Sequence, residues 1–124
     1  MTECQSIVPV LKVSNLARAI DFYQNVLGFS VRWQSENDGG GENCMLAAGE
    51  TNLLLSTGDH LGSQPQFTGT LYFQMRDVRP FFQTVCDKVE IVWPLERMDY
   101  GQLEFGIRDR DGYVLAFAEP VDEK

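Results

Sequence analysis

The sequence predicts an α+β fold made of two tandem βαβββ modules, whose strands form a cupped, partly open mixed β-sheet with the helices on its outer face. First, 124 residues with 44% hydrophobic content suit one compact domain spanning 1–124. Second, strand-like and helix-like periodicities occur twice in the same order. Third, the halves superpose without a gap at one offset, since Val13 and Met75 stand 62 positions apart, as do Val31 and Trp93. These observations indicate an internal duplication.

The first module is expected at about residues 5–57. Its β-branched residues predict a strand over 7–13, and Asn15 then suits the N-cap of a helix because its side chain can accept a backbone hydrogen bond. Gly28 ends the helical periodicity. Alternation predicts three further strands, and the glycine-rich run between the first two of them predicts a loop or hairpin tip. The strands are placed at 29–33, 44–48 and 52–56, and the loop at 35–43.

The second module is expected at about 68–120, after a linker at about 58–67. It begins with a strand at 70–75, and Asp77 is the predicted N-cap of a helix that tolerates Pro80 in its first turn. Strands are predicted at 91–93, 103–108 and 114–118. The dipeptide Asp111-Gly112 predicts a tight turn between the last two, because both residues accept positive φ angles.

Charge and cysteine content exclude several classes of protein. A formal net charge of −8 and a pI near 4.5 oppose binding to nucleic acids or anionic membranes and slightly favour a cationic ligand. Three separated cysteines predict reduced thiols rather than a disulfide framework or a zinc site. Without a long apolar run or an N-terminal signal segment, a cytoplasmic protein is expected.

Two segments carry a family resemblance. VPVLKVSNLARAIDFYQNVLGF and YGQLEFGIRDRDGYVLAFAEP resemble the N-terminal and C-terminal signatures of the vicinal-oxygen-chelate superfamily, which includes glyoxalases, bleomycin-resistance proteins and extradiol dioxygenases. The resemblance implies paired βαβββ modules, a homodimer, and a ligand in the cupped sheet.

The metal-dependent members of that superfamily imply ligand positions at Val8, Leu54, Thr70 and Ala116. None of these residues offers the imidazole, thiolate or carboxylate that transition metals require, so we expect neither a metal nor another cofactor. His60 is the only histidine, which excludes a two-histidine-one-carboxylate site. A catalytic triad would have to use His60, but no GxSxG motif or other recognisable nucleophile setting accompanies it. No catalytic residue is assigned.

Alternation along the strands predicts which side chains face the ligand. In the strand before Asp109, Leu103, Phe105 and Ile107 should lie under the helix, so that Glu104 faces the cavity. Glu104 is expected either to receive a cationic or hydroxylated ligand group or to pair with Lys12 or Arg108. The complete set of candidate ligand-binding residues is Val8, Lys12, Trp33, Leu54, Thr70, Tyr72, Gln74, Glu104, Arg108 and Ala116.

The sequence therefore favours binding over catalysis. Missing metal ligands, acidic charge and Pro9 in the first strand resemble bleomycin-resistance-like members, which sequester a cationic antibiotic between two subunits. We expect a metal-free protein that holds a cationic or aromatic small molecule in a dimer cleft. The alternative is a glyoxalase-like lyase or isomerase with relocated ligands such as Glu104, Glu42 and His60, since the two glutamates also stand 62 positions apart. A partner-binding module with a vestigial cleft is a third reading.

Overall fold

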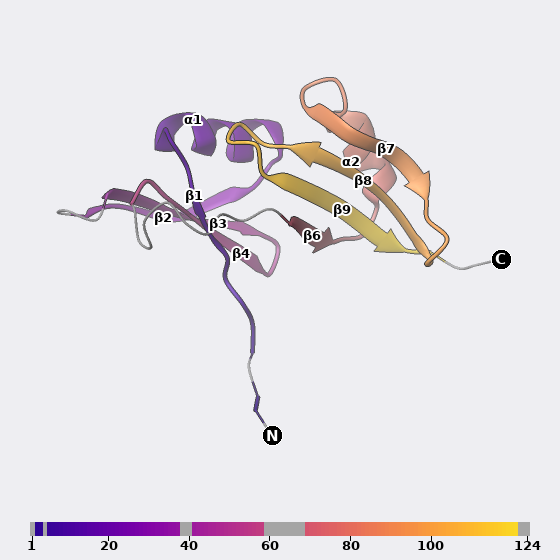
Figure 1. The fold of residues 1–124 in the computed structure, drawn as a ribbon, viewed down its shortest axis with the longest axis horizontal. Coiled ribbons are helices and arrows are strands. Elements are labelled where there is room, and N and C mark those ends of the chain that lie inside the picture. Colours follow the sequence, from indigo (N-terminus) through magenta and orange to yellow (C-terminus); the bar gives the residue numbers. More distant parts are fainter. Residues whose placement is uncertain (1, 4, 38–40, 59–68, 122–124) are drawn as a thin grey trace. The chain divides into compact units, whose positions relative to one another are not determined.

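The computed structural model describes residues 2–3, 5–37, 41–58 and 69–121. It divides into two compact units, Met1–Pro65 and Gln66–Lys124, each described here by itself (Figure 1). Apart from Gly58, the predicted linker lies outside the described residues, as does His60. Each unit contains one four-stranded mixed sheet, so the predicted α+β class and the two βαβββ modules are confirmed.

In the first unit, the sheet has the strand order β1-β4-β3-β2. Strand β1 pairs with β4 in parallel, and the other neighbours are antiparallel. A helical segment after β1 contacts β3 and β4 and covers one face of the sheet. The elements are β1 (Val10–Lys12), α1 (Leu16–Asp21), the π-helical η1 (Phe22–Val26), β2 (Ser30–Asn37), β3 (Gly41–Ala48) and β4 (Thr51–Ser56).

The second unit repeats this topology, with strand order β6-β9-β8-β7 and a parallel β6–β9 pair. Its helix contacts β8 and β9. The elements are β6 (Thr70–Gln74), α2 (Val78–Val85), β7 (Glu90–Arg97), β8 (Gln102–Arg108) and β9 (Val114–Pro120).

The glycine-rich run is more ordered than its composition predicts. Residues 35–43 are predicted to form a loop or hairpin tip, and they form the end of the β2–β3 hairpin, in which β2 continues to Asn37 and β3 begins at Gly41. The loop alternative is therefore wrong for the paired residues, such as Ser35 opposite Asn43, and residues 38–40 lie outside the described residues. The physical reason is that backbone pairing extends a hairpin even where polar side chains give no hydrophobic alternation.

The two copies do not share one gapless offset. The parallel pairs β1–β4 and β6–β9 keep an offset of 62 positions, because Val10 pairs with Leu54 and Tyr72 with Ala116. In the antiparallel pairs β2–β3 and β7–β8, Trp33 pairs with Met45 whereas Trp93 pairs with Gly106. Trp93 therefore stands 60 positions after Trp33, and Gly106 stands 61 positions after Met45. The predicted match of Val31 with Trp93 is therefore wrong, and Trp33 is the structural counterpart of Trp93.

The π-helical turn explains part of this difference. In η1 the Leu27 amide donates to the Phe22 carbonyl over 3.1 Å, a five-residue spacing that inserts a residue relative to an α-helix. The second unit has only the α-helix between its corresponding strands. The predicted helix boundaries hold, since the Asn15 side chain accepts from the Arg18 amide and Gly28 has φ +82°.

Aromatic packing forms the core of the second unit between α2 and the sheet. Phe105 on β8 packs against Phe81 and Phe82 of the helix, with ring centroids 6.0 and 4.9 Å apart. Phe117 on β9 lies 4.9 Å from Phe81 by the same measure. Ile107 is buried as well. The predicted placement of Phe105 under the helix is confirmed.

Helix α2 is capped by a residue that local sequence does not reveal. Asp77 occupies the N-cap position, but its backbone is left-handed, with φ 57°, and its side chain makes no capping hydrogen bond. Instead, Glu119 at the end of β9 accepts from the Val78 amide over 2.7 Å. A carboxylate at a helix N-terminus is stabilising because it satisfies a free N–H and faces the positive end of the helix dipole.

Replacing the two acidic residues separately will distinguish their roles. We expect Glu119→Ala to lower the free energy of unfolding by about 1 kcal/mol, the usual cost of a lost cap. Asp77→Gly should not lower it, because glycine adopts a positive φ without strain. Urea denaturation of both variants measures this, and a larger loss in Asp77→Gly would return the capping role to Asp77.

Candidate functional site

The sheet of the second unit has a free face opposite α2. Cross-strand partners share a face, so the row next to Phe105 and Phe117 points away from the helix. That row runs Tyr72, Ala116, Gly106 and Trp93 across the four strands. Neighbouring rows bring the other predicted residues of this unit to the same face, namely Thr70, Gln74, Glu104 and Arg108. Their role in ligand binding stays a prediction.

Glu104 is the buried centre of this face. The residue is only 1% exposed, and both of its carboxylate oxygens accept hydrogen bonds. Oε2 accepts from the Tyr72 hydroxyl and from Trp93 Nε1, each over 3.0 Å, and Oε1 accepts from the Tyr100 hydroxyl over 2.6 Å. Burying a carboxylate is costly unless donors replace its water. We call these four residues the Glu104 cluster.

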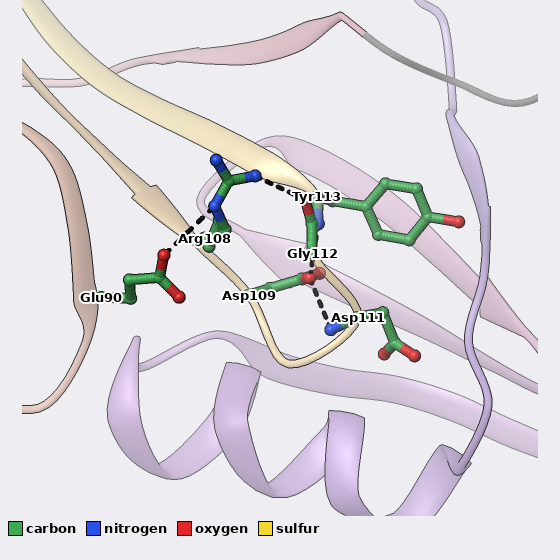
Figure 2. Close-up of polar contacts among 6 residues, drawn as sticks. All are labelled: Glu90, Arg108, Asp109, Asp111, Gly112 and Tyr113. Atoms are coloured by element: carbon green, nitrogen blue, oxygen red, sulfur yellow. Dashed lines mark hydrogen bonds and ion pairs between the residues drawn. The ribbon is translucent and has the colours of Figure 1, made fainter.

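One alternative predicted for Glu104, an ion pair with Arg108, is not formed. Among the described residues of the second unit, the hydrogen-bond donors to Glu104 are neutral side chains, and Arg108 is not one of them. Pairing with Lys12, which belongs to the other unit, stays a prediction. Arg108 instead contacts Glu90, with Nε 3.2 Å from Oε2, as Figure 2 shows. Both of these side chains are well exposed. Such an exposed pair contributes little to stability, whereas the hydrogen bonds to buried Glu104 contribute more.

The turn beside Arg108 is built around Asp109 rather than the predicted Asp111. Asp109 is buried, and its Oδ1 accepts from the amides of Asp111 and Tyr113, each over 2.9 Å (Figure 2). Gly112 supplies the positive φ, +91°. The aspartate thus stabilises the turn through its side chain. Arg108 also donates to the Gly112 carbonyl over 3.4 Å, which places its guanidinium over this end of the sheet.

Gly106 allows the Trp93 indole to lie across the sheet. A Cβ atom at position 106 would stand 2.7 Å from three atoms of that indole, closer than packed atoms approach. The absence of a side chain therefore lets the ring reach Glu104. Strand β7 contributes through a bulge, because Ile91 pairs with Ile107 and Trp93 with Gly106, which leaves Val92 without a partner.

The tyrosine hydroxyls form the accessible edge of the cluster. Tyr72 is 49% exposed and Tyr100 is 57% exposed, although both contact buried Glu104. The hydrogen bond to Glu104, followed by the one with Tyr72, raises the pKa of Tyr100 above its ordinary value, because each favours the protonated phenol. Tyr100 therefore stays a protonated donor to higher pH than an ordinary tyrosine does.

The free face of the first unit differs in chemistry. Its corresponding row is Val10, Leu54, Met45 and Trp33, which is entirely apolar. Met45 stands where the second unit has Gly106, so the flat indole placement seen at Trp93 has no room here, and Trp33 is 46% exposed. The predicted residues Lys12, beside Ser56 in the ladder, and Val8, just before β1, complete this side.

The predicted equivalence of Glu42 and Glu104 in the two modules is wrong. Glu104 stands opposite Ala118, whose counterpart Ser56 stands opposite Asn43. Asn43 is therefore the structural equivalent of Glu104, and Glu42 lies on the other face of its strand. The Glu42 amide donates a hydrogen bond to the Thr57 hydroxyl, and the Thr57 amide donates one to the Glu42 carbonyl.

The positions implied for a metal lie on the free faces. Val8 and Leu54 belong to the first unit, and Thr70 and Ala116 to the second, where Ala116 pairs with Tyr72. Their side chains supply no imidazole, thiolate or carboxylate. Within the described residues, no three His, Cys, Asp or Glu side chains are grouped to hold a metal ion. Cys44 is buried, and burial raises the pKa of its thiol, which disfavours the thiolate that metals bind.

Sequence reasoning missed Trp93 and Tyr100. Trp93 was recognised as a strand residue, but the bulge at Val92 changes the face on which it lies, and no residue type announces a bulge. Tyr100 lies in the turn before β8, where strand alternation does not apply. The available signal was Gly106, a residue without a side chain in the middle of a strand, which often marks the close approach of another group.

Comparison with known proteins assigns the fold. Residues 6–117 match the family described as the Glyoxalase/Bleomycin resistance protein/Dioxygenase superfamily. A protein of unknown function from Agrobacterium tumefaciens str. C58 is 27% identical over 98% of both chains, with a TM-score of 0.74. TnmS3, an antibiotic binding protein from Streptomyces sp. CB03234, is 20% identical over 97% of this chain and 98% of its own, with a TM-score of 0.78.

A third structure, a superfamily member from Sphaerobacter thermophilus DSM 20745, is 21% identical over 94% of this chain and 98% of its own, with a TM-score of 0.77. The two less similar structures show a shared fold alone. No curated protein matches the chain. The family match and the two βαβββ units together define the class, and the chain belongs to the Glyoxalase/Bleomycin resistance protein/Dioxygenase superfamily. None of the described helices has the length and apolar character needed to cross a membrane.

Adding one methyl group at Gly106 tests how Trp93 is held. We expect Gly106→Ala to displace the indole and break its bond to Glu104, lowering the free energy of unfolding by about 1–3 kcal/mol, as overpacking usually does. Ala47→Gly, two residues after the Gly106 counterpart Met45 on β3, controls for the general effect of changing a strand residue. An unshifted Trp93 indole N–H resonance in Gly106→Ala would contradict the packing described.

Tyrosinate absorbance tests the environment of Tyr100. Because its pKa is raised in the folded state, this hydrogen bond contributes stability below the ordinary tyrosine pKa, about 10, and the contribution is lost as pH rises through the raised value. Subtracting the tyrosinate absorbance of Tyr100→Phe from that of the wild type, at each pH, isolates the contribution of Tyr100. This difference should show no rise near pH 10. In Glu104→Gln, Tyr100 should titrate closer to its ordinary pKa. Ordinary titration of Tyr100 in the wild type would contradict the hydrogen bond.

Proposed function

We propose that the chain is a metal-free small-molecule binding protein that works as a homodimer and holds a cationic or aromatic ligand against the free face of its sheets. The Glu104 cluster carries this proposal. Three aromatic side chains are fixed around a buried carboxylate, and two of them remain about half exposed. Exposed aromatic rings held in a fixed orientation give contact area at little entropic cost, which suits a binding surface.

The cost of the arrangement supports a role beyond folding. The sheet could pack as well with an apolar side chain in place of Glu104, since replacing buried charged groups by apolar ones is often neutral or stabilising. In the first unit the equivalent position holds the neutral residue Asn43, although the same topology forms. A feature present in one copy and unnecessary for the topology is a reasonable place to locate the ligand.

Superfamily membership supports the same class of function. TnmS3 is an antibiotic binding protein with this fold, so the fold accommodates small-molecule binding without prescribing the ligand. The alternative lyase or isomerase is less well supported, because Glu42 and Glu104 do not occupy equivalent positions in the two units. In addition, the Glu104 carboxylate already accepts hydrogen bonds from three donors. We therefore favour binding over catalysis.

A fragment screen read by two-dimensional NMR tests the proposal. The chain has two tryptophans, so Trp33→Phe assigns the remaining indole N–H resonance to Trp93. We expect a subset of small aromatic or cationic fragments to shift the Trp93 resonance saturably, under conditions where sedimentation gives the mass of a dimer. A complete screen without a saturable shift at Trp93 would remove this face from the proposed site.

A metal titration separates the binding protein from the enzyme alternative. Protein stripped with a chelator is titrated calorimetrically with nickel, zinc, manganese and ferrous iron under reducing, anaerobic conditions. We expect no saturable heat, because the implied positions lack suitable donor atoms. Tight stoichiometric binding would instead support the lyase or isomerase.

A further inference from the structure

The hydrogen-bond directions in the Glu104 cluster determine what its exposed edge can recognise. Each tyrosine hydroxyl has one proton and two acceptor lone pairs. Glu104 takes the Tyr100 proton at 2.6 Å and the Tyr72 proton at 3.0 Å, whereas the two hydroxyl oxygens are 3.5 Å apart. The Trp93 N–H is also directed at the carboxylate. The polar groups of the cluster therefore have no proton left to donate to a ligand.

What remains at the exposed edge is acceptor capacity. The oxygens of Tyr72 and Tyr100 keep lone pairs, and both residues are about half exposed. Hydrogen bonds to an ionised carboxylate polarise the hydroxyl groups, which makes their oxygens better acceptors. A ligand that approaches this edge must therefore bring its own donors.

The local charge adds a second requirement. The carboxylate of Glu104 is surrounded in the described residues by three neutral donors, so its negative charge is shared but not cancelled. Glu96 stands directly opposite Glu104 on β7 and is exposed, which adds a further carboxylate to this face. Arg108, on the same face, is engaged by Glu90. The potential at the tyrosine edge is thus negative and repels anions.

We propose that the exposed edge of the Glu104 cluster binds the protonated nitrogen of a ligand, an ammonium, amidinium or guanidinium group whose N–H bonds point at the Tyr72 and Tyr100 oxygens. This inference rests on the proposed function and narrows its ligand class. A quaternary ammonium satisfies the charge and can interact with aromatic faces, but it has no N–H for the hydroxyl oxygens. A carboxylate or phosphate meets neither requirement.

Four probes that share a benzene ring test the inference. Benzamidinium carries charge and N–H donors, phenyltrimethylammonium carries charge alone, benzamide carries N–H donors alone, and benzoate is an anion. Each is titrated into the protein with the Trp93 indole N–H resonance as the readout. We expect benzamidinium to bind at least about fivefold more tightly than phenyltrimethylammonium or benzamide, as one charge-assisted hydrogen bond allows. Benzoate should cause no saturable shift.

Matched variants assign the effect to the hydroxyl oxygens. Tyr100→Phe removes both the proposed N–H acceptor and a donor to Glu104. It should therefore weaken benzamidinium more than phenyltrimethylammonium, because only benzamidinium uses the lost acceptor. Tyr113→Phe removes a hydroxyl in the β8–β9 turn and should change neither. Circular dichroism confirms that each variant is folded. Equal affinities for benzamidinium and phenyltrimethylammonium, or no benzamidinium shift, would overturn the inference.

The outcomes separate this inference from the proposed function. If neutral or anionic aromatic fragments bind at Trp93 as tightly as benzamidinium does, the preference for a protonated nitrogen is wrong while small-molecule binding at this face stands. If neither these probes nor the wider fragment screen shifts the Trp93 resonance, both proposals fail.

Discussion

The need to satisfy one buried carboxylate organises the free face of the second unit. Glu104 lies in the centre of a sheet, where water cannot solvate it, so its oxygens must be met by side chains. Tyr72 comes from β6, Trp93 from β7 and Tyr100 from the turn before β8, so one acceptor fixes side chains from three segments. Gly106 completes the arrangement by leaving space for the indole. The residues of this face therefore depend on one another, because a substitution at any of them removes a hydrogen bond or the space that another one needs.

The comparison between the two units shows how a duplicated fold diverges. The backbone correspondence is close, because the Val13 amide donates to Ser56 and the Met75 amide to Ala118, equivalent bonds at equivalent strand ends. Both inner hairpins also contain a bulge just before their tryptophan. The side chains on the free faces differ, with an apolar row in one unit and the Glu104 cluster in the other. Topology is thus shared while the chemistry has separated, which is why family membership does not identify a ligand.

Local periodicity explains what the sequence could predict. The N-cap at Asn15, the helix end at Gly28 and the burial of Phe105 each depend on a few neighbouring residues, and each is confirmed. The errors arise where distant segments decide the outcome. The π-helical turn in the first unit and the different spacing of paired residues in the two inner hairpins shift the register, so the offset of 62 misplaces Trp93 and makes Glu42 look equivalent to Glu104. Candidate Glu104 was found, but its partners depend on tertiary contacts that no local pattern contains.

The cap of helix α2 has a consequence for the order in which the chain can assemble. Val78 and Glu119 are 41 positions apart, and β6 obtains its parallel partner β9 only from residues 114–120. During synthesis, the start of α2 and one edge of β6 therefore emerge from the ribosome well before the segment that completes them. In the first unit, the capping hydrogen bond of α1 joins Asn15 to the Arg18 amide, only three residues later in the chain. The first unit can form its helix cap as it is made, whereas the helix cap of the second unit must wait for β9.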